Sequence, residues 1–215
     1  MATIGEFTAP HKRDFALSLI VLTTTVAIAV CSVQPWTVVE KIRPNEQGVL
    51  APPLTRSLSD LYPIPGFVMH CAVVLALIGA GWWVYSRLYQ TEAHEKAKLL
   101  VVASLAGLVG WLGIGGDIEP AFGLGNWSFD GLSAVSLSDR TRTVHLVAAV
   151  LAVWLSILGF LVASAASILG ARDDKQAVSG AVHMAIFAAL IGVALLVLAV
   201  IALSFIAIVI SGGGN

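Results

Sequence analysis

Long apolar segments alternate with polar connections along the chain. Five segments are long enough to cross a bilayer, which takes about 20 helical residues. They cover residues 15–35, 66–88, 97–115, 143–170 and 180–210, after an N-terminal stretch at 1–14 and before a tail at 212–215. All eight prolines lie at the edges of these segments or between them, where no helical hydrogen bond is lost. The pattern predicts an all-α fold, a five-helix transmembrane bundle within residues 15–211.

Two long connections, residues 36–65 and 116–142, are predicted to emerge on the same face of the membrane. The first is rich in proline and the second in glycine, aspartate and serine. Within them, Thr37–Ile42 and Ser133–Leu137 alternate loosely between apolar and polar residues, as short strands do. We therefore expect two extracytoplasmic loops that form a small cap with short strands.

The distribution of lysine and arginine predicts the orientation. Seven of these residues lie in the N-terminal stretch and the two short turns, and five lie in the two long loops. This favours a multi-pass protein with a cytoplasmic N-terminus and an outside C-terminus. The first apolar segment is longer than the core of a typical signal peptide, so we expect it to be retained as a helix.

Composition supports the membrane interpretation and excludes other classes. Hydrophobic residues make up 58% of the 215 residues and charged residues only 12%, about half of what a soluble domain carries. The net charge of −1 gives no basis for nucleic-acid binding, which requires clustered basic residues. The lipid bilayer is the expected partner, and abundant alanine, valine and glycine favour a bacterial plasma membrane.

Stripes of small residues predict where the helices approach each other, because association in lipid depends on close backbone contact. They recur at three- or four-residue spacing on four of the five segments. The predicted packing residues are Ala72, Ala76, Ala80, Gly107, Gly110, Ala152, Ser156, Gly159, Ala163, Ala185, Ala189 and Gly192.

Ionisable residues other than histidine are expected only at the ends of the segments. Arg87 and Lys98 are assigned to the turn between the second and third segments. Ion-coupled transporters and proton pumps need ionisable groups at depth, so this pattern argues against an ion-coupled mechanism and against catalysis in the membrane.

Four side chains near the outer ends of the helices are candidates for cofactor or metal binding. His70 and His145 lie at matching depths on the second and fourth segments and predict axial ligation of haem b. Together with Cys31 and Cys71 they are an alternative copper or zinc site. The competing interpretation is that the histidines bond loop carbonyls and the cysteines pack as small apolar groups.

The second long loop also contains four carboxylates. Asp117, Glu119, Asp130 and Asp139 could bind calcium or a basic partner surface, but their spacing does not match that of a calcium-binding loop.

These features predict a non-catalytic accessory or assembly subunit of a larger membrane complex, envelope or respiratory. The fifth segment supports this hypothesis because it is longer than a bilayer requires and must tilt, protrude or be covered by another subunit. Two alternatives remain: an electron-transfer subunit with haem b on His70 and His145, and a passive channel or small-molecule permease.

Overall fold

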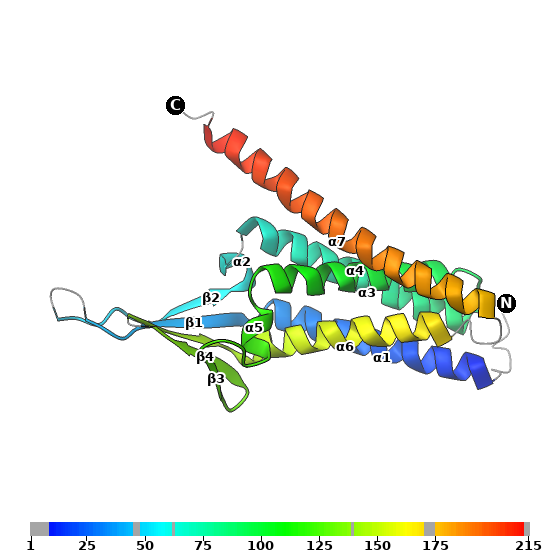
Figure 1. Cartoon of the computed structure of the whole chain (residues 1–215), viewed down its shortest axis with the longest axis horizontal. Coiled ribbons are helices and arrows are strands. Elements are labelled where there is room, and N and C mark those ends of the chain that lie inside the picture. Colours follow the sequence, from blue (N-terminus) through cyan, green and yellow to red (C-terminus); the bar gives the residue numbers. More distant parts are fainter. Residues whose placement is uncertain (1–8, 45–47, 62, 139, 170–174, 213–215) are drawn as a thin grey trace.

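The computed structural model describes residues 9–44, 48–61, 63–138, 140–169 and 175–212. Four long helices form a bundle, with a β-sheet at one end and a further helix that leans away from it (Figure 1). The bundle consists of α1 (Ala9–Ser32), α3 (Pro63–Leu88), α4 (His94–Ile114) and α6 (Val147–Leu169). Each contains a stretch long and apolar enough to cross a membrane. Asp139 and most of the predicted N-terminal stretch and C-terminal tail lie outside the described residues.

The four bundle helices are arranged in a ring. Helix α1 packs against α3 and α6, and α4 packs against the same two helices from the other side. Small side chains fill the contact faces, among them Ala76 and Ala80 on α3 and Ala163 on α6, all fully buried. A β-carbon on Gly79 would lie 2.8 Å from a Val101 methyl group, so α3 and α4 pack closely there. Close packing at small residues is how helices associate without a hydrophobic driving force.

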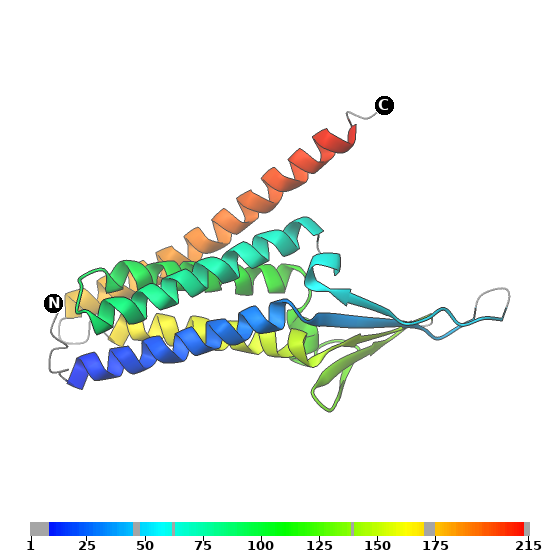
Figure 2. The same ribbon diagram turned by 180° about the vertical axis from the view of Figure 1, so that it is seen from behind.

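Helix α7 (Lys175–Gly212) is the longest element and crosses the bundle obliquely. Its N-terminal half packs mainly on α4 and also touches α6 and α3. Its C-terminal half separates from the bundle toward the side of the sheet, and the view from behind shows the same divergence (Figure 2). Helix α7 is therefore inclined relative to the four bundle helices.

The two long loops form one five-stranded antiparallel sheet, so the prediction of an all-α fold is wrong. Strands β1 (Pro35–Lys41) and β2 (Leu54–Ser57) come from the first loop, and β3 (Trp127–Asp130), β4 (Ser133–Leu137) and β5 (Thr141–His145) from the second. The strand order is β2-β1-β5-β4-β3. The two predicted strands are present as β1 and β4. The other three are four or five residues long, and each contains a charged residue that obscures the alternation from which strands are recognised.

The sheet is a direct continuation of the bundle. Strand β1 follows α1 after a two-residue turn, and β5 leads into α6 through Leu146. The Trp36 side chain is buried between them and donates a hydrogen bond from Nε1 to the carbonyl of Cys31 at 2.9 Å. The Leu146 amide donates to the Trp36 carbonyl at 2.8 Å, which connects the two halves of the chain. Two short helices, α2 (Leu58–Leu61) and α5 (Ile118–Ala121), lie at this junction.

Candidate functional site

A polar cavity of about 320 Å³ lies where the sheet meets the helix ends. Its floor is one face of the sheet. Arg56, Thr37 and His145 are aligned across β2, β1 and β5 as directly paired residues, and directly paired residues point to the same face. The next row on that face contributes Val39, Thr143 and Trp127. The alternation of a strand thus collects side chains from both loops in one site.

The remaining wall of this junction cavity comes from α2 and from the turn between α4 and α5. Leu61 belongs to α2, and Gly115, Gly116 and Asp117 form the turn. Gly116 has φ +79°, a left-handed conformation that glycine adopts without strain. The Asp117 amide then donates to the Leu112 carbonyl at 3.0 Å, which folds the turn back onto α4 and places the Asp117 side chain at the cavity.

The His145 side chain lines the junction cavity and is largely buried there. Burial lowers the pKa of His145 to about 4, so its imidazole is neutral at pH 7. Its Nδ1 lies 4.0 Å from Oδ1 of Asp117, which is beyond hydrogen-bonding distance. Its ring meets the Trp127 ring edge to face, with 4.9 Å between the centroids. A neutral imidazole offers one donor and one acceptor nitrogen.

Thr37 supplies a hydroxyl with unused bonding capacity. The residue is only 2% exposed, and within the described part of the chain its Oγ1 has no hydrogen-bond partner. A buried hydroxyl without a partner costs free energy, so such groups usually mark a place where water or a ligand completes the bonding. Arg56, by contrast, is exposed at the edge of the cavity. The cavity therefore combines a buried carboxylate and hydroxyl with an accessible guanidinium.

The residues predicted for haem or metal binding are divided between separate environments. His70 Nδ1 lies 2.7 Å from the carbonyl of Gly66, one turn back on its own helix, and His70 is not part of the junction cavity. Cys31 and Cys71 are both free thiols. Among the described residues, no three metal-ligating side chains come together. The haem and metal hypotheses stay predictions, and His145 alone of the four lines the junction cavity.

The predicted packing residues lie mostly at helix contacts. Gly192 on α7 shows the closest approach, because a β-carbon there would lie 1.9 Å from the carbonyl oxygen of Ala103 on α4. A β-carbon on Gly159 would lie within 3.3 Å of side chains on α4 and α1, and one on Gly110 would meet Val193 at 3.2 Å. Ala72, Ala76, Ala80, Gly107, Ala152, Ser156 and Ala163 are buried, and Ala185 and Ala189 are half-buried.

A cluster of ionised side chains lies at the end of the bundle opposite the sheet. Asp14 of α1 pairs with Arg87 of α3, and its other oxygen lies 3.1 Å from Lys98 Nζ of α4. Lys98 also pairs with Glu95 at 3.1 Å and lies over the Trp83 ring, 5.4 Å from its centroid. Lys98 is only 1% exposed. Two carboxylates and two cations thus balance their charges across three helices.

This ion cluster corrects the expectation that Arg87 and Lys98 belong to a solvated turn. Helices α1 and α4 begin at Ala9 and His94, earlier than the sequence pattern predicted, so the charged residues fall within the helices. The cluster stays within about two turns of the helix ends, and its charges are paired. Such an arrangement fixes the helices to one another, since separating either partner would leave an uncompensated buried charge.

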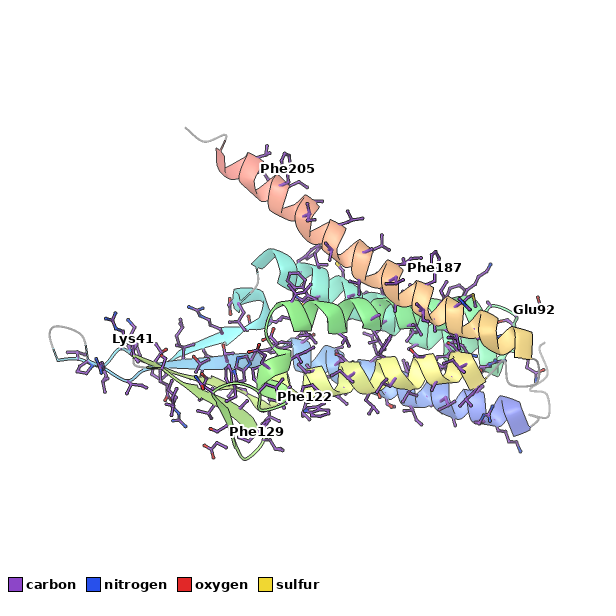
Figure 3. The ribbon with its side chains drawn as sticks, viewed as in Figure 1. Lys41, Glu92, Phe122, Phe129, Phe187 and Phe205 are labelled. Carbon is purple, nitrogen blue, oxygen red and sulfur yellow. The ribbon has the colours of Figure 1, made fainter. Side chains whose placement is uncertain are left out.

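An apolar groove of about 260 Å³ is lined by residues of α3, α4 and α7. Small residues form much of its wall, including Ala72, Ala103, Gly107 and Gly192, and Cys71 also lines it. Beyond the groove, α7 exposes large apolar side chains along its length, of which Phe187 and Phe205 are labelled in Figure 3.

Sequence reasoning missed three residues of the junction cavity: Thr37 as a polar group, Arg56 and Trp127. Asp117 was considered only as one of four loop carboxylates. The strand Thr37–Ile42 contained the useful signal, because its alternation places Thr37 and Val39 on one face. The pairing of this strand with β5 across the length of the chain is not encoded locally.

No protein-family model, curated protein or solved structure matches the chain.

Proposed function

We propose that the chain is a non-catalytic integral membrane subunit that assembles with another membrane protein. In this proposal α7 is the fifth membrane-spanning helix, the N-terminus is cytoplasmic, the sheet and C-terminus are outside, and the membrane is the plasma membrane. Basic residues that the structure describes at the end opposite the sheet support this orientation, namely Lys12, Arg13, Arg87, Lys96 and Lys98.

The exposure of the C-terminal half of α7 is the observation that carries the proposal. Apolar side chains on the bundle helices are exposed along one face, which lipid covers. On α7 they are spread over more than half of the circumference at 3.6 residues per turn. The exposed residues are Leu195, Val197, Leu198, Ile201, Phe205, Ile206, Val209 and Ile210.

The groove beside α7 supports a transmembrane helix as the group that covers the exposed side of α7. The alanine and glycine residues in the wall of this groove allow the backbone of another helix to approach closely, as in helix association within membranes. We infer that one transmembrane helix of a second protein lies between α7 and α3. A symmetric pair of two copies through α7 is the competing arrangement.

Site-specific photocrosslinking in native membranes tests this proposal. A photoreactive residue at Leu198 or Phe205 is expected to capture one defined membrane protein. The matched controls are Val74 and Ile78, exposed apolar positions on α3. These are expected to give lipid adducts only. Adducts of the chain with itself, or lipid adducts at every position, would contradict the proposal.

A substitution at the α7 contact provides an independent test. Gly192→Leu places a side chain where a β-carbon alone already meets the Ala103 carbonyl, so α7 must move away from α4. We expect the partner to be lost on purification in mild detergent while the bundle remains folded. Gly81→Leu is the control, because a β-carbon at Gly81 has nothing within 4 Å. Retention of the partner by the Gly192 variant would contradict the proposed interface.

A further inference from the structure

An exposed aromatic surface lies beside the sheet end of α6, on elements other than those of the proposed α7 interface. The Trp154 indole of α6 donates a hydrogen bond from Nε1 to the carbonyl of Ala121 in α5 at 3.1 Å. The Phe122 ring, directly after α5, packs on the Trp154 ring with 4.5 Å between the centroids. Phe122 is 42% exposed and Trp154 is 45% exposed, so a large part of both rings is uncovered.

Trp154 lies on the face of α6 that meets lipid. Leu151, Leu158 and Leu161 share that face at three-, four- and seven-residue spacing from Trp154, and all three are exposed. Helix α6 is long and apolar enough to cross a membrane, so these side chains contact acyl chains. Trp154 lies about 10 Å along the helix axis from the first residue of α6. The Trp154 and Phe122 rings are therefore near the membrane interface, where tryptophan is enriched in membrane proteins.

The turn between β3 and β4 lies at the end of the sheet that is nearest the helices. Strand β5 ends at His145, just before α6 begins, so the sheet row that contains His145 is the row closest to the bundle. In that row His145 is paired with Ala134, and Ala134 with Phe129. The turn at residues 131–132 continues beyond this row, and Figures 1 and 2 show the hairpin beside the bundle on the side of α6.

Phe129 and Leu132 extend the exposed surface from α6 onto this hairpin. A β-carbon on Gly123 would lie 2.9 Å from the Phe129 ring, so the ring packs against the residue that follows Phe122. Figure 3 shows Phe122 and Phe129 on the same side of the molecule. Phe129 and Leu132 are both exposed. The hairpin surface thus consists of Phe122, Phe129, Leu132 and Trp154.

The charges near the hairpin surface argue against electrostatic attachment to anionic lipid. Residues 118–137 contain no lysine or arginine, and their acidic residues are Glu119 and Asp130. Asp130 follows Phe129 on β3, so its side chain points to the opposite face of the sheet, where Arg142 lies 3.9 Å away. Attachment through such a surface depends on the apolar area that is buried, since the electrostatic contribution requires basic residues.

We propose that the hairpin surface inserts into the headgroup region of the membrane leaflet nearest the sheet, so that its ligand is the lipid surface. The continuity of Phe122 and Trp154 with the lipid-facing side of α6 favours lipid over a protein partner. This contact holds the β3–β4 hairpin against the membrane and fixes the position of the sheet relative to the bilayer. It requires that α6 spans the membrane and does not depend on the proposed partner of α7.

Fluorescence quenching by lipid-borne nitroxides tests the proposal on the full chain in phosphatidylcholine nanodiscs. An environment-sensitive fluorescent amino acid replaces Leu132 in one variant and Leu137 in the control. Both leucines are exposed, but Leu137 pairs with Arg142, about 10 Å farther from the helices than the row of Ala134. A nitroxide at the headgroup end of the acyl chain is expected to quench the probe at Leu132 about threefold more than the probe at Leu137. Equal quenching at the two positions would overturn the proposal, and a probe at Phe122 repeats the comparison if the Leu132 variant is unstable.

Two further measurements separate apolar insertion into lipid from the other ways of covering this surface. Replacing part of the phosphatidylcholine by phosphatidylglycerol, or raising the salt concentration, is expected to change the quenching of the Leu132 probe by less than about twofold, because residues 118–137 contain no basic side chain. In native membranes, a photoreactive residue at Leu132 is expected to give lipid adducts. A larger dependence on anionic lipid, or a protein adduct at Leu132, would overturn the proposal.

Discussion

Each end of the helix bundle buries an aspartate side chain, and the surroundings of the two side chains differ. At the end opposite the sheet, Asp14 contacts Arg87, Lys98 and the indole N–H of Trp83, the last at 3.4 Å. At the sheet end, Asp117 borders a cavity of about 320 Å³, with a neutral imidazole 4.0 Å away. Asp14 is surrounded by protein cations, whereas Asp117 borders an accessible cavity.

This difference separates structural from binding roles. Paired buried charges fix the positions of α1, α3 and α4, because each partner is costly to expose or to leave alone. The Thr37 hydroxyl is buried and has no hydrogen-bond partner among the described residues. Such a group lowers the stability of the protein unless water or a ligand completes its bonding. The following predictions test this contrast.

Asp14→Asn is expected to have the largest effect on stability. The substitution leaves Lys98 and Arg87 beside a neutral amide in a largely buried site, and breaking a buried pair costs about 3–5 kcal/mol. Thermal unfolding in detergent should shift to a clearly lower temperature. A melting curve that coincides with that of the parent would show that the ion cluster does not hold the bundle together.

Acidification is expected to destabilise the sheet end through His145. Its pKa is about 4 when folded and about 6.5 when unfolded, so between these values the unfolded chain binds more protons. Stability is fully present above about pH 6.5 and falls as the pH drops, by about 2 kcal/mol at pH 5 and about 3 kcal/mol below pH 4. Unfolding of the parent and of His145→Gln should be compared at pH 7.5 and pH 5. If the variant loses as much stability on acidification as the parent, another group is responsible.

Thr37→Val is expected to stabilise the protein by about 1 kcal/mol, because it removes a buried hydroxyl that has no partner in the described part of the chain. Thr55→Val, at an exposed position on β2, is the control and should leave the stability unchanged. Lower stability of the Thr37 variant would indicate that the hydroxyl already has a partner.

The smallest effect is expected at the surface of the sheet. Glu40 and Arg142 pair at 3.4 Å with both side chains about 40% exposed, and such pairs contribute at most about 1 kcal/mol. Glu40→Gln should therefore leave the melting temperature nearly unchanged and make it insensitive to salt. A loss comparable to that of Asp14→Asn would remove the distinction between buried and exposed pairs.

The sequence predicts the membrane part of this fold well and the sheet only in part. Hydropathy indicates the four bundle helices because a bilayer demands about 20 apolar residues in a row. Small-residue spacing indicates contacts such as that of Gly192, where only glycine fits. Gly79 was not among the predicted packing residues, although Ala76 lies three residues before it.

The junction cavity could not be predicted because it depends on pairing between distant strands. Thr37 and His145 are directly paired in the sheet although a large part of the chain separates them. The alternation of residues within one strand does not determine which other strand it pairs with. A shift of one residue in the pairing would turn Thr37 to the opposite face. The ion cluster was missed for a different reason: hydropathy treats Lys98 and Arg87 as the end of a segment, whereas their charges are neutralised by residues of other helices.

The order of strands in the sheet has a consequence for how the protein is made. Strand β1 is synthesised early but pairs with β5, which emerges only after α4 has been completed. Until then, the β1–β2 hairpin has an unpaired edge, and such edges readily pair with foreign strands. A nascent chain that stalls after α4 would therefore be prone to aggregate through the exposed edge of the hairpin. Synthesis of Thr141–His145 supplies β5, which pairs with that edge.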